Sequence, residues 1–195
     1  GPAYDGIGHL IVSSDGSAYT ARTGDDAFVI ANGTPSERWG AVGRLQLSHG
    51  HVAYTASAGE GWHVVHDASI GPTVDEVSEL VLSDDGAEVA WAATLATVTV
   101  VALGDHPVAS WPGVTHPRLA LSVAGSLAYV APVDTGGEQV IADRHGGPVY
   151  DEIRRPVWSA TGELAYAARR GTTWAIVAGD REVVQASALG DPVGS

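Results

Sequence analysis

The sequence contains no cysteine, no methionine and no lysine. Without cysteine the chain can form neither disulfides nor zinc–thiolate sites, and it has no thiol nucleophile. No segment approaches the roughly 18 consecutive apolar residues of a membrane span, so we expect no direct membrane insertion. All positive charge comes from ten arginines against 23 acidic residues, for a formal net charge of −13. This balance disfavours binding to nucleic acid, which requires a broad basic surface.

Short signatures of catalysis are also missing. There is no Gly-x-Ser-x-Gly nucleophile elbow, no P-loop, no Gly-x-Gly-x-x-Gly and no His-Glu-x-x-His. A glycosidase would need paired carboxylates with room for a sugar between them, whereas the loops predicted here are short. We therefore expect that the chain is not an enzyme and uses no cofactor.

A five-fold internal repeat is the clearest feature that the sequence does have. Serines recur 35 to 39 residues apart, each after an apolar run, and each precedes an Ala-(Tyr/Trp)-x-Ala motif. The repeated serines are Ser13, Ser48, Ser83, Ser122 and Ser159. The repeated aromatic residues are Tyr19, Tyr54, Trp91, Tyr129 and Tyr166. A repeat of this length indicates one supersecondary unit that is stacked or arranged in a ring.

Each repeat contains four short runs that suit β-strands, separated by Gly, Asp, Asn or Pro. In the second repeat these runs are 45–47, 52–56, 62–65 and 74–77. Four antiparallel strands in about 37 residues are typical of a propeller blade. The aromatic residues of the repeat are then expected to pack between blades.

We therefore predict an all-β fold, a β-propeller of five short four-stranded antiparallel blades that forms one domain over residues 1–195. The predicted blades are 9–43, 44–78, 79–117, 118–154 and 155–195. Residues 1–8 are a possible ring-closing strand, although 182–185 could fill the same place. The alternative is a fragment of a larger ring with six to eight blades.

The turn sequences Ser-Asp-Gly at 14–16 and Asp-Asp-Gly at 84–86, each followed by an Ala-aromatic strand, resemble a known family. They are similar to the bacterial WD40-like propeller repeat of the TolB type, whose consensus is Ser-Pro-Asp-Gly. The Asp-Gly pair is present only in the first and third repeats. The resemblance implies a propeller that serves as a binding platform, and a bacterial protein that is periplasmic, in the cell envelope or secreted.

One ionisable residue stands four positions before each repeated serine, at the entrance to the innermost strand. These residues are His9, Arg44, Glu79, Arg118 and Arg155. In a propeller they would converge near the central axis, and three arginines suit an anion or an acidic side chain of a partner. The same rim is predicted to carry Arg22, Arg154, Arg169 and Arg170. The alternative is that these arginines pair with nearby acidic residues and have no binding role.

Histidines of the second repeat form a weaker candidate site. His49, His51, His66 and Asp67 are expected at one end of neighbouring strands, where imidazole and carboxylate groups could hold zinc or copper. Histidines in turns are more often simply solvated. We therefore predict no metal site and keep these four residues only as weak candidates.

The predicted function is a non-catalytic, monomeric binding module that recognises a protein or peptide partner on the arginine-bearing rim. The first alternative is a lectin-like propeller that binds a small ligand or a carbohydrate. Trp39 and Trp111 fall in fourth-strand segments together with Tyr4 and Tyr150, but Val74 stands there in the second repeat, which counts against five equal sites. The second alternative is an accessory domain of a larger enzyme.

Overall fold

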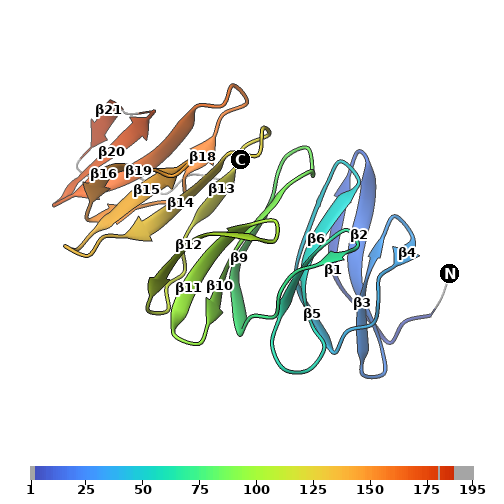
Figure 1. The fold of residues 1–195 in the computed structure, drawn as a ribbon. Coiled ribbons are helices and arrows are strands. Elements are labelled where there is room, and N and C mark those ends of the chain that lie inside the picture. Colours follow the sequence, from blue (N-terminus) through green and yellow to red (C-terminus); the bar gives the residue numbers. More distant parts are fainter. Residues whose placement is uncertain (1–2, 180, 187–195) are drawn as a thin grey trace. The chain divides into compact units, whose positions relative to one another are not determined.

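A computed structural model describes residues 3–179 and 181–186 and divides the chain into two compact units, 1–116 and 117–195. Within the described residues there are 21 strands and no α-helix. No helix in these ranges is therefore long and apolar enough to cross a membrane. The strands form five antiparallel sheets, three in unit 1 and two in unit 2 (Figure 1).

Unit 1 contains the first, second and third sheets. The first sheet is β1 (Gly6–Ser13), β2 (Gly16–Thr23), β3 (Asp26–Ala31) and β4 (Thr34–Pro35). The second is β5 (Ala41–Ser48), β6 (His51–Ser57), β7 (His63–His66) and β8 (Ser69–Ile70). The third is β9 (Glu76–Leu82), β10 (Val89–Leu95), β11 (Val98–Leu103) and β12 (His106–Pro112).

Unit 2 contains the fourth and fifth sheets. The fourth is β13 (Leu119–Leu121), β14 (Leu127–Pro132), β15 (Glu138–Ala142) and β16 (His145–Tyr150). The fifth is β17 (Glu152–Ile153) and β18 (Val157–Trp158), which both pair with β19 (Leu164–Arg170), then β20 (Thr173–Ala178) and β21 (Arg181–Ala186). Each of the five sheets is a meander in chain order. The predicted fold class is confirmed: the fold is all-β, that of a propeller with five short four-stranded blades.

The predicted fourth strand of the second repeat, 74–77, is wrong. The fourth strand is β8, which pairs with β7, and residues 76–77 open β9 of the third sheet. Pro72 has no N–H to donate to the ladder and interrupts the fourth strand, which resumes only as a bridge between Val74 and Trp62. The N–H of Asp75 already donates to the carbonyl oxygen of Thr94 in the third sheet.

The innermost strands of unit 1 begin earlier than predicted. In each of them the pairing with the second strand continues past a register shift toward the start of the chain segment. β1 starts at Gly6 and its register with β2 shifts at His9, while β5 shifts at Gly43 and Arg44. In β9 the shift falls at Ser78. Residues 6–8 therefore pair with β2 as part of β1, and β21 takes the fourth position of the fifth sheet. A ring-closing role for residues 1–8 stays a prediction, and residues 1 and 2 lie outside the described part.

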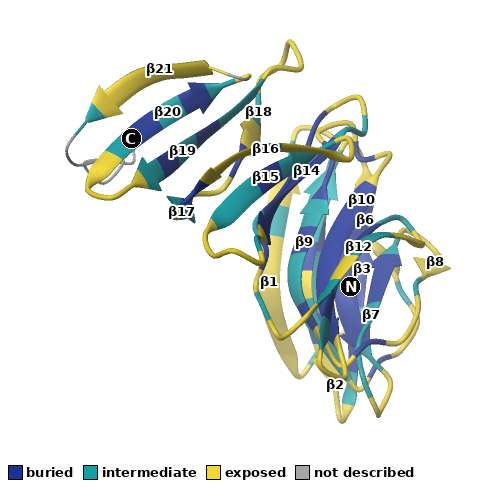
Figure 2. Ribbon diagram, turned by 60° about the vertical axis from the view of Figure 1, so that its left-hand side comes forward, coloured by how far each residue is buried: buried dark blue, intermediate teal, exposed yellow. Residues whose placement is uncertain are grey.

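Aromatic and aliphatic side chains fill the spaces between neighbouring sheets of each unit. Tyr54 (second sheet) packs with Val29 of the first sheet, and Trp91 (third sheet) packs with Val64 of the second. In unit 2, Tyr166 of β19 packs with Tyr150 of β16, their ring centroids 6.3 Å apart. In the second and third sheets burial is greatest along the second strands, β6 and β10, as Figure 2 shows. The prediction that these aromatic residues pack between blades is therefore confirmed for Tyr54, Trp91 and Tyr166.

Candidate ligand-binding site

A cavity of about 540 Å³ lies between the outer parts of the first and second sheets, within unit 1. Its wall is mainly apolar and includes Val29 of β3, Tyr54 of β6, Val65 of β7 and Ile70 of β8. Trp39 and Glu37 come from the segment after β4. A concave, mostly apolar space of this size with a few polar groups is typical of small-ligand sites.

Backbone pairing fixes the position of Trp39. Its N–H donates to the carbonyl oxygen of Ala27 at 2.8 Å, and its carbonyl oxygen accepts the N–H of Ala27 at 2.7 Å. This bridge extends the short strand β4 and turns the indole toward the gap between the sheets, where Trp39 packs with Val29, Tyr54 and Val65. Trp39 is 6% exposed, so its ring belongs to the wall of the cavity as well as to the core.

The indole N–H of Trp39 is buried and has no hydrogen-bond partner in the described structure. Leaving a buried donor unsatisfied costs about 1–3 kcal/mol. Trp111 occupies the corresponding fourth-strand position of the third sheet, opposite Thr99, and its indole N–H donates to Thr115 Oγ1 at 2.9 Å. Of these two indole N–H groups, therefore, only that of Trp39 lacks an acceptor.

Tyr54 packs beside Trp39 and also lines the cavity. Burial raises the pKa of its phenol, and the neighbouring Glu37 carboxylate raises this pKa further. The Ser36 hydroxyl and the Trp39 indole partly offset this rise in pKa, since both can stabilise the phenolate. The phenol is thus close to the indole, but the indole N–H has no hydrogen bond of acceptable geometry.

Arg44, in the middle of β5, contacts the neighbouring innermost strand. The exposed Arg44 donates from Nη2 to the carbonyl oxygen of Ser78 at 2.6 Å, and its backbone N–H donates to Thr55 Oγ1 at 2.9 Å. Since Ser78 precedes Glu79, two of the five predicted site residues lie on adjacent strands. His9 is exposed on β1.

In unit 2 the two predicted arginines flank the inner strands: Arg118 directly precedes β13, and Arg155 lies between β17 and β18. Arg118 Nη2 forms an ion pair with Glu138 Oε1 at 2.6 Å. Arg155 donates from Nη1 to the carbonyl oxygen of Leu119 at 3.1 Å. Arg44 and Arg155 thus contact the inner strand of the neighbouring sheet, whereas Arg118 pairs with β15 of the sheet that it precedes. Partner binding by the five residues stays a prediction.

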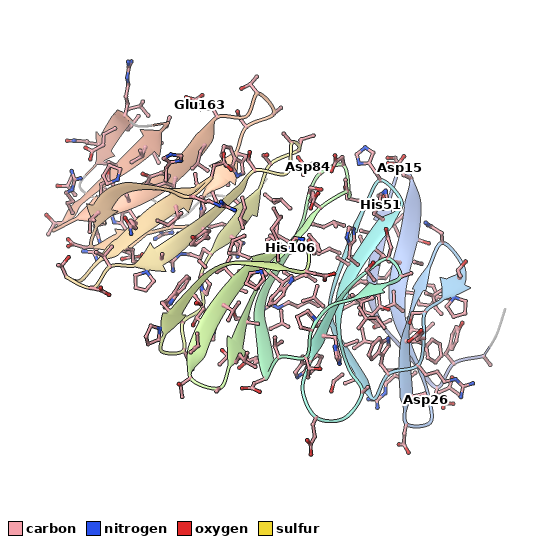
Figure 3. All side chains as sticks on the ribbon, in the orientation of Figure 1. Asp15, Asp26, His51, Asp84, His106 and Glu163 are labelled. Carbon is pink, nitrogen blue, oxygen red and sulfur yellow. The ribbon has the colours of Figure 1, made fainter. Side chains whose placement is uncertain are left out.

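The weak histidine candidates are partly brought together. His51 Nδ1 lies 2.8 Å from Asp67 Oδ2, and His66 Nε2 lies 4.0 Å from the same oxygen. His49 points elsewhere, with Nδ1 2.6 Å from the carbonyl oxygen of Asp84. In Figure 3, His51 and Asp84 are labelled at the same end of unit 1, opposite Asp26.

The cavity was not predicted from the sequence, although part of the signal was present. Trp39 is an aromatic residue in a predicted fourth-strand segment, and Tyr54 was predicted to pack between blades. Nothing in the sequence marked Ser36 or Glu37 as residues of a cavity. Whether the Trp39 indole N–H finds an acceptor depends on where the polar groups of the neighbouring sheet lie. A Trp in a position that holds Val74 in the next repeat was the usable signal.

Comparisons with known proteins give no family assignment. No family model matches the chain, and no curated protein matches it. Among solved structures, Hsv2 of Kluyveromyces marxianus is 13% identical, with a TM-score of 0.46 over 94% of this chain and 73% of that one. TolB of Acinetobacter baumannii is 14% identical, with a TM-score of 0.46 over 89% of this chain and 51% of that one.

A third solved structure is the β-propeller domain of the Trilobed protease of Pyrococcus furiosus. It is 9% identical, with a TM-score of 0.39 over 92% of this chain and 84% of that one. Similarity this low carries no argument about function. The fold assignment rests on the five sheets themselves.

Proposed function

We propose that this protein is a non-catalytic binding module whose site for a small ligand is the cavity between the first and second sheets. The observation that carries the proposal is the buried, unpartnered indole N–H of Trp39 in the wall of that cavity. A ligand that accepts this hydrogen bond removes a desolvation penalty that the unliganded protein bears. No such gain is available at Trp111, whose indole already has a partner.

The lining defines the chemical class of the ligand. Val29, Val65 and Ile70 favour an apolar body, and the indole favours a hydrogen-bond acceptor. The carboxylates of Glu37 and Asp67 also line the cavity and disfavour an anion. The ligand is therefore a neutral small molecule that combines an apolar ring or chain with a carbonyl or hydroxyl oxygen.

The test uses benzamide as a neutral aromatic probe with one strong acceptor. In a ¹⁵N-labelled sample, each indole N–H gives its own NMR resonance, and Trp39→Phe identifies that of Trp39. Benzamide is expected to shift the Trp39 resonance, and Trp39→Phe to weaken binding about three- to tenfold, the value of one neutral hydrogen bond.

Trp111→Phe is the matched control, because it removes an indole in the same strand position that already has a partner. Its affinity for benzamide should equal that of the wild type. Equal affinity in Trp39→Phe and wild type, or no shift of the Trp39 resonance, would contradict the proposal. Binding of monosaccharides instead of benzamide would favour a lectin.

A second candidate function, recognition of an acidic peptide, is favoured by a cluster of arginines and aromatic rings in unit 2. The guanidinium of Arg154 lies 5.0 Å from the Trp174 ring centroid, and that of Arg169 lies 5.9 Å from the same centroid. Arg154 is exposed, whereas Arg169 is paired with Glu152. Stacked guanidinium groups keep their donors directed outward for carboxylates.

In unit 2 this cluster and the predicted residues Arg118 and Arg155 are candidates for binding a protein or peptide partner, and in unit 1 the candidates are His9, Arg44 and Glu79. Binding of a hexaglutamate peptide should weaken with salt and be lost in Arg154→Ala, but not in Arg38→Ala, whose exposed arginine lies in unit 1. Binding of hexaglutamate that does not depend on salt would contradict this second candidate function. An extracytoplasmic location stays a proposal that rests on the repeat resemblance.

A further inference from the structure

The hairpin of β6 and β7 brings two histidines and an aspartate together at one end of the second sheet. Ala53 is paired with His66, and His51 lies two residues before Ala53 on the same strand. Since side chains alternate between the two faces of a strand, His51 and His66 share a face as diagonal neighbours. Their ring centroids are 6.2 Å apart. Asp67 follows directly in the β7–β8 turn.

From this geometry we propose that His51, His66 and Asp67 bind a divalent transition-metal ion, Zn²⁺ or Cu²⁺. One ligand atom from each residue lies within 4.8 Å of the other two. Zinc binds nitrogen at about 2.0–2.1 Å, so two ligand atoms of a tetrahedral site are about 3.3 Å apart. The observed separations of 2.8 Å and 4.0 Å lie on either side of that value, so small side-chain rotations suffice.

The carboxylate of Asp67 is held in place by the backbone. Asp67 Oδ1 accepts the N–H of Val52 at 2.9 Å, and this leaves Oδ2 directed at the histidines. Asp67 also has a positive φ of 52°, which places its side chain across the hairpin end. Orientation of a metal-binding group by a hydrogen bond of this kind is common in metalloproteins.

The third sheet closes one side of the cluster. A Cβ placed on Gly86 would lie 2.7 Å from the Cβ of His51, so only glycine allows the Asp85–Gly86 turn to approach this closely. The carbonyl oxygen of Gly86 lies 2.9 Å from His66 Nε2. Metal coordination by Nε2 replaces that hydrogen bond. Affinity should therefore be lower than in a closed structural zinc site with four protein ligands.

The ligand types select the class of metal. Imidazole nitrogens suit zinc and copper, whereas Mg²⁺ and Ca²⁺ prefer sites made wholly of oxygen. An ion can reach the cluster, since the side chains of His51 and Asp67 are 46% and 45% exposed. Three protein ligands leave a fourth position for water or for a donor atom from outside the protein. The proposal is independent of the proposed ligand site, although Asp67 also lines that cavity.

The test is isothermal titration calorimetry of the chelator-treated protein with ZnCl₂, with MgCl₂ as the comparison ion. We expect one zinc per chain, no heat with magnesium, and shifts of two histidine ring C–H resonances in NMR spectra. His51→Ala and His66→Ala should each weaken zinc binding at least about tenfold.

Asp67→Asn is the sharpest variant, because it keeps an oxygen for the Val52 N–H and removes only the charged ligand. It should also weaken zinc binding at least about tenfold while the unfolding temperature without zinc stays unchanged. His106→Ala, which removes an exposed histidine of the same unit, should bind zinc as the wild type does. The proposal is overturned if the wild type gives no heat with zinc, or if His51→Ala binds zinc as tightly as the wild type.

Discussion

The two units each contain a cavity between neighbouring sheets, and the two cavities differ in the fourth-strand residue beside them. That between the first and second sheets is about 540 Å³ and that between the fourth and fifth sheets is about 530 Å³. An aromatic residue of the second strand lines each one, Tyr54 in unit 1 and Tyr166 in unit 2. The two cavities are therefore alike in size and in their aromatic lining.

The two cavities differ at one fourth-strand position: Trp39 lines the cavity of unit 1, whereas Tyr150 does not line that of unit 2 but packs against Tyr166, which does. Trp39 pairs with Ala27 and Tyr150 pairs with Glu138, so the two occupy the same position of their sheets. The hydroxyl of Tyr150 donates to Glu182 Oε1 at 3.0 Å, whereas the indole N–H of Trp39 has no partner in the described structure. A cavity becomes a candidate site when its wall holds a buried polar group without a hydrogen-bond partner. A ligand that pairs with this group removes the desolvation penalty that the unliganded protein bears.

The largest expected effect tests whether the two positions are equally important for packing. Trp39 and Tyr150 are 6% and 3% exposed, so Trp39→Ala and Tyr150→Ala should each lower the free energy of unfolding by about 3–5 kcal/mol. Urea denaturation followed by circular dichroism measures both losses. A loss below about 1 kcal/mol at either residue would mean that the position is not part of a packed core.

A smaller effect on the free energy of unfolding should distinguish the Tyr150 hydroxyl from the Trp39 indole N–H. Tyr150→Phe removes a hydrogen bond to a carboxylate and should cost about 1.5–3 kcal/mol. Trp39→Phe removes an unsatisfied donor, and this relief offsets the loss of ring volume, so the net change should stay below about 1 kcal/mol. The same denaturation measurements apply. Similar costs at both residues would erase the proposed difference between the cavities.

The smallest effect concerns alkaline pH. Burial and the Glu182 carboxylate raise the pKa of Tyr150 from 10.0 to about 12. Between these pH values the unfolded chain has lost the phenol proton while the folded protein retains it, so stability falls as the pH rises. Below pH 10 both states are protonated and Tyr150 adds no pH dependence.

Tyr150→Phe should therefore reduce the loss of stability between pH 10 and pH 12, measured as the change in unfolding temperature. Tyr54→Phe is a useful comparison, because the pKa of Tyr54 is also raised, mainly by burial. An unchanged alkaline slope in Tyr150→Phe would show that other tyrosines control it.

Much of the fold could be predicted from periodicity. The repeated serines fell at the turns between first and second strands, where Ser83, Ser122 and Ser159 each accept a backbone N–H through Oγ. The Ala-aromatic motifs fell on the buried second strands. The fourth strand of the second sheet was misplaced because Val74 and Val77 suit either of two sheets, and sequence pattern does not say to which sheet a strand residue pairs.

The candidate sites were less accessible to sequence reasoning. The histidine cluster was partly predicted, since an antiparallel hairpin brings 51 and 66 together once the strands are known. Partner binding by the arginines stays a prediction, and the hydrogen bonds of Arg44 and Arg155 to carbonyl oxygens of the neighbouring inner strand were not predicted. Such contacts depend on the spacing of sheets, which a single repeat does not encode.

The sequence by itself determined the number of blades, the order of strands within them and the identity of the aromatic residues between them. These follow from local alternation of apolar residues and from glycines and prolines at turns. Only the tertiary structure decided that the Trp39 indole lacks an acceptor while the Trp111 indole has Thr115. The physical reason is that a hydrogen bond depends on the placement of two groups to within a fraction of an ångström. The Trp111 indole reaches Thr115 four residues further along the chain, whereas the Trp39 indole packs against Tyr54 of the next sheet, whose distance is set by packing.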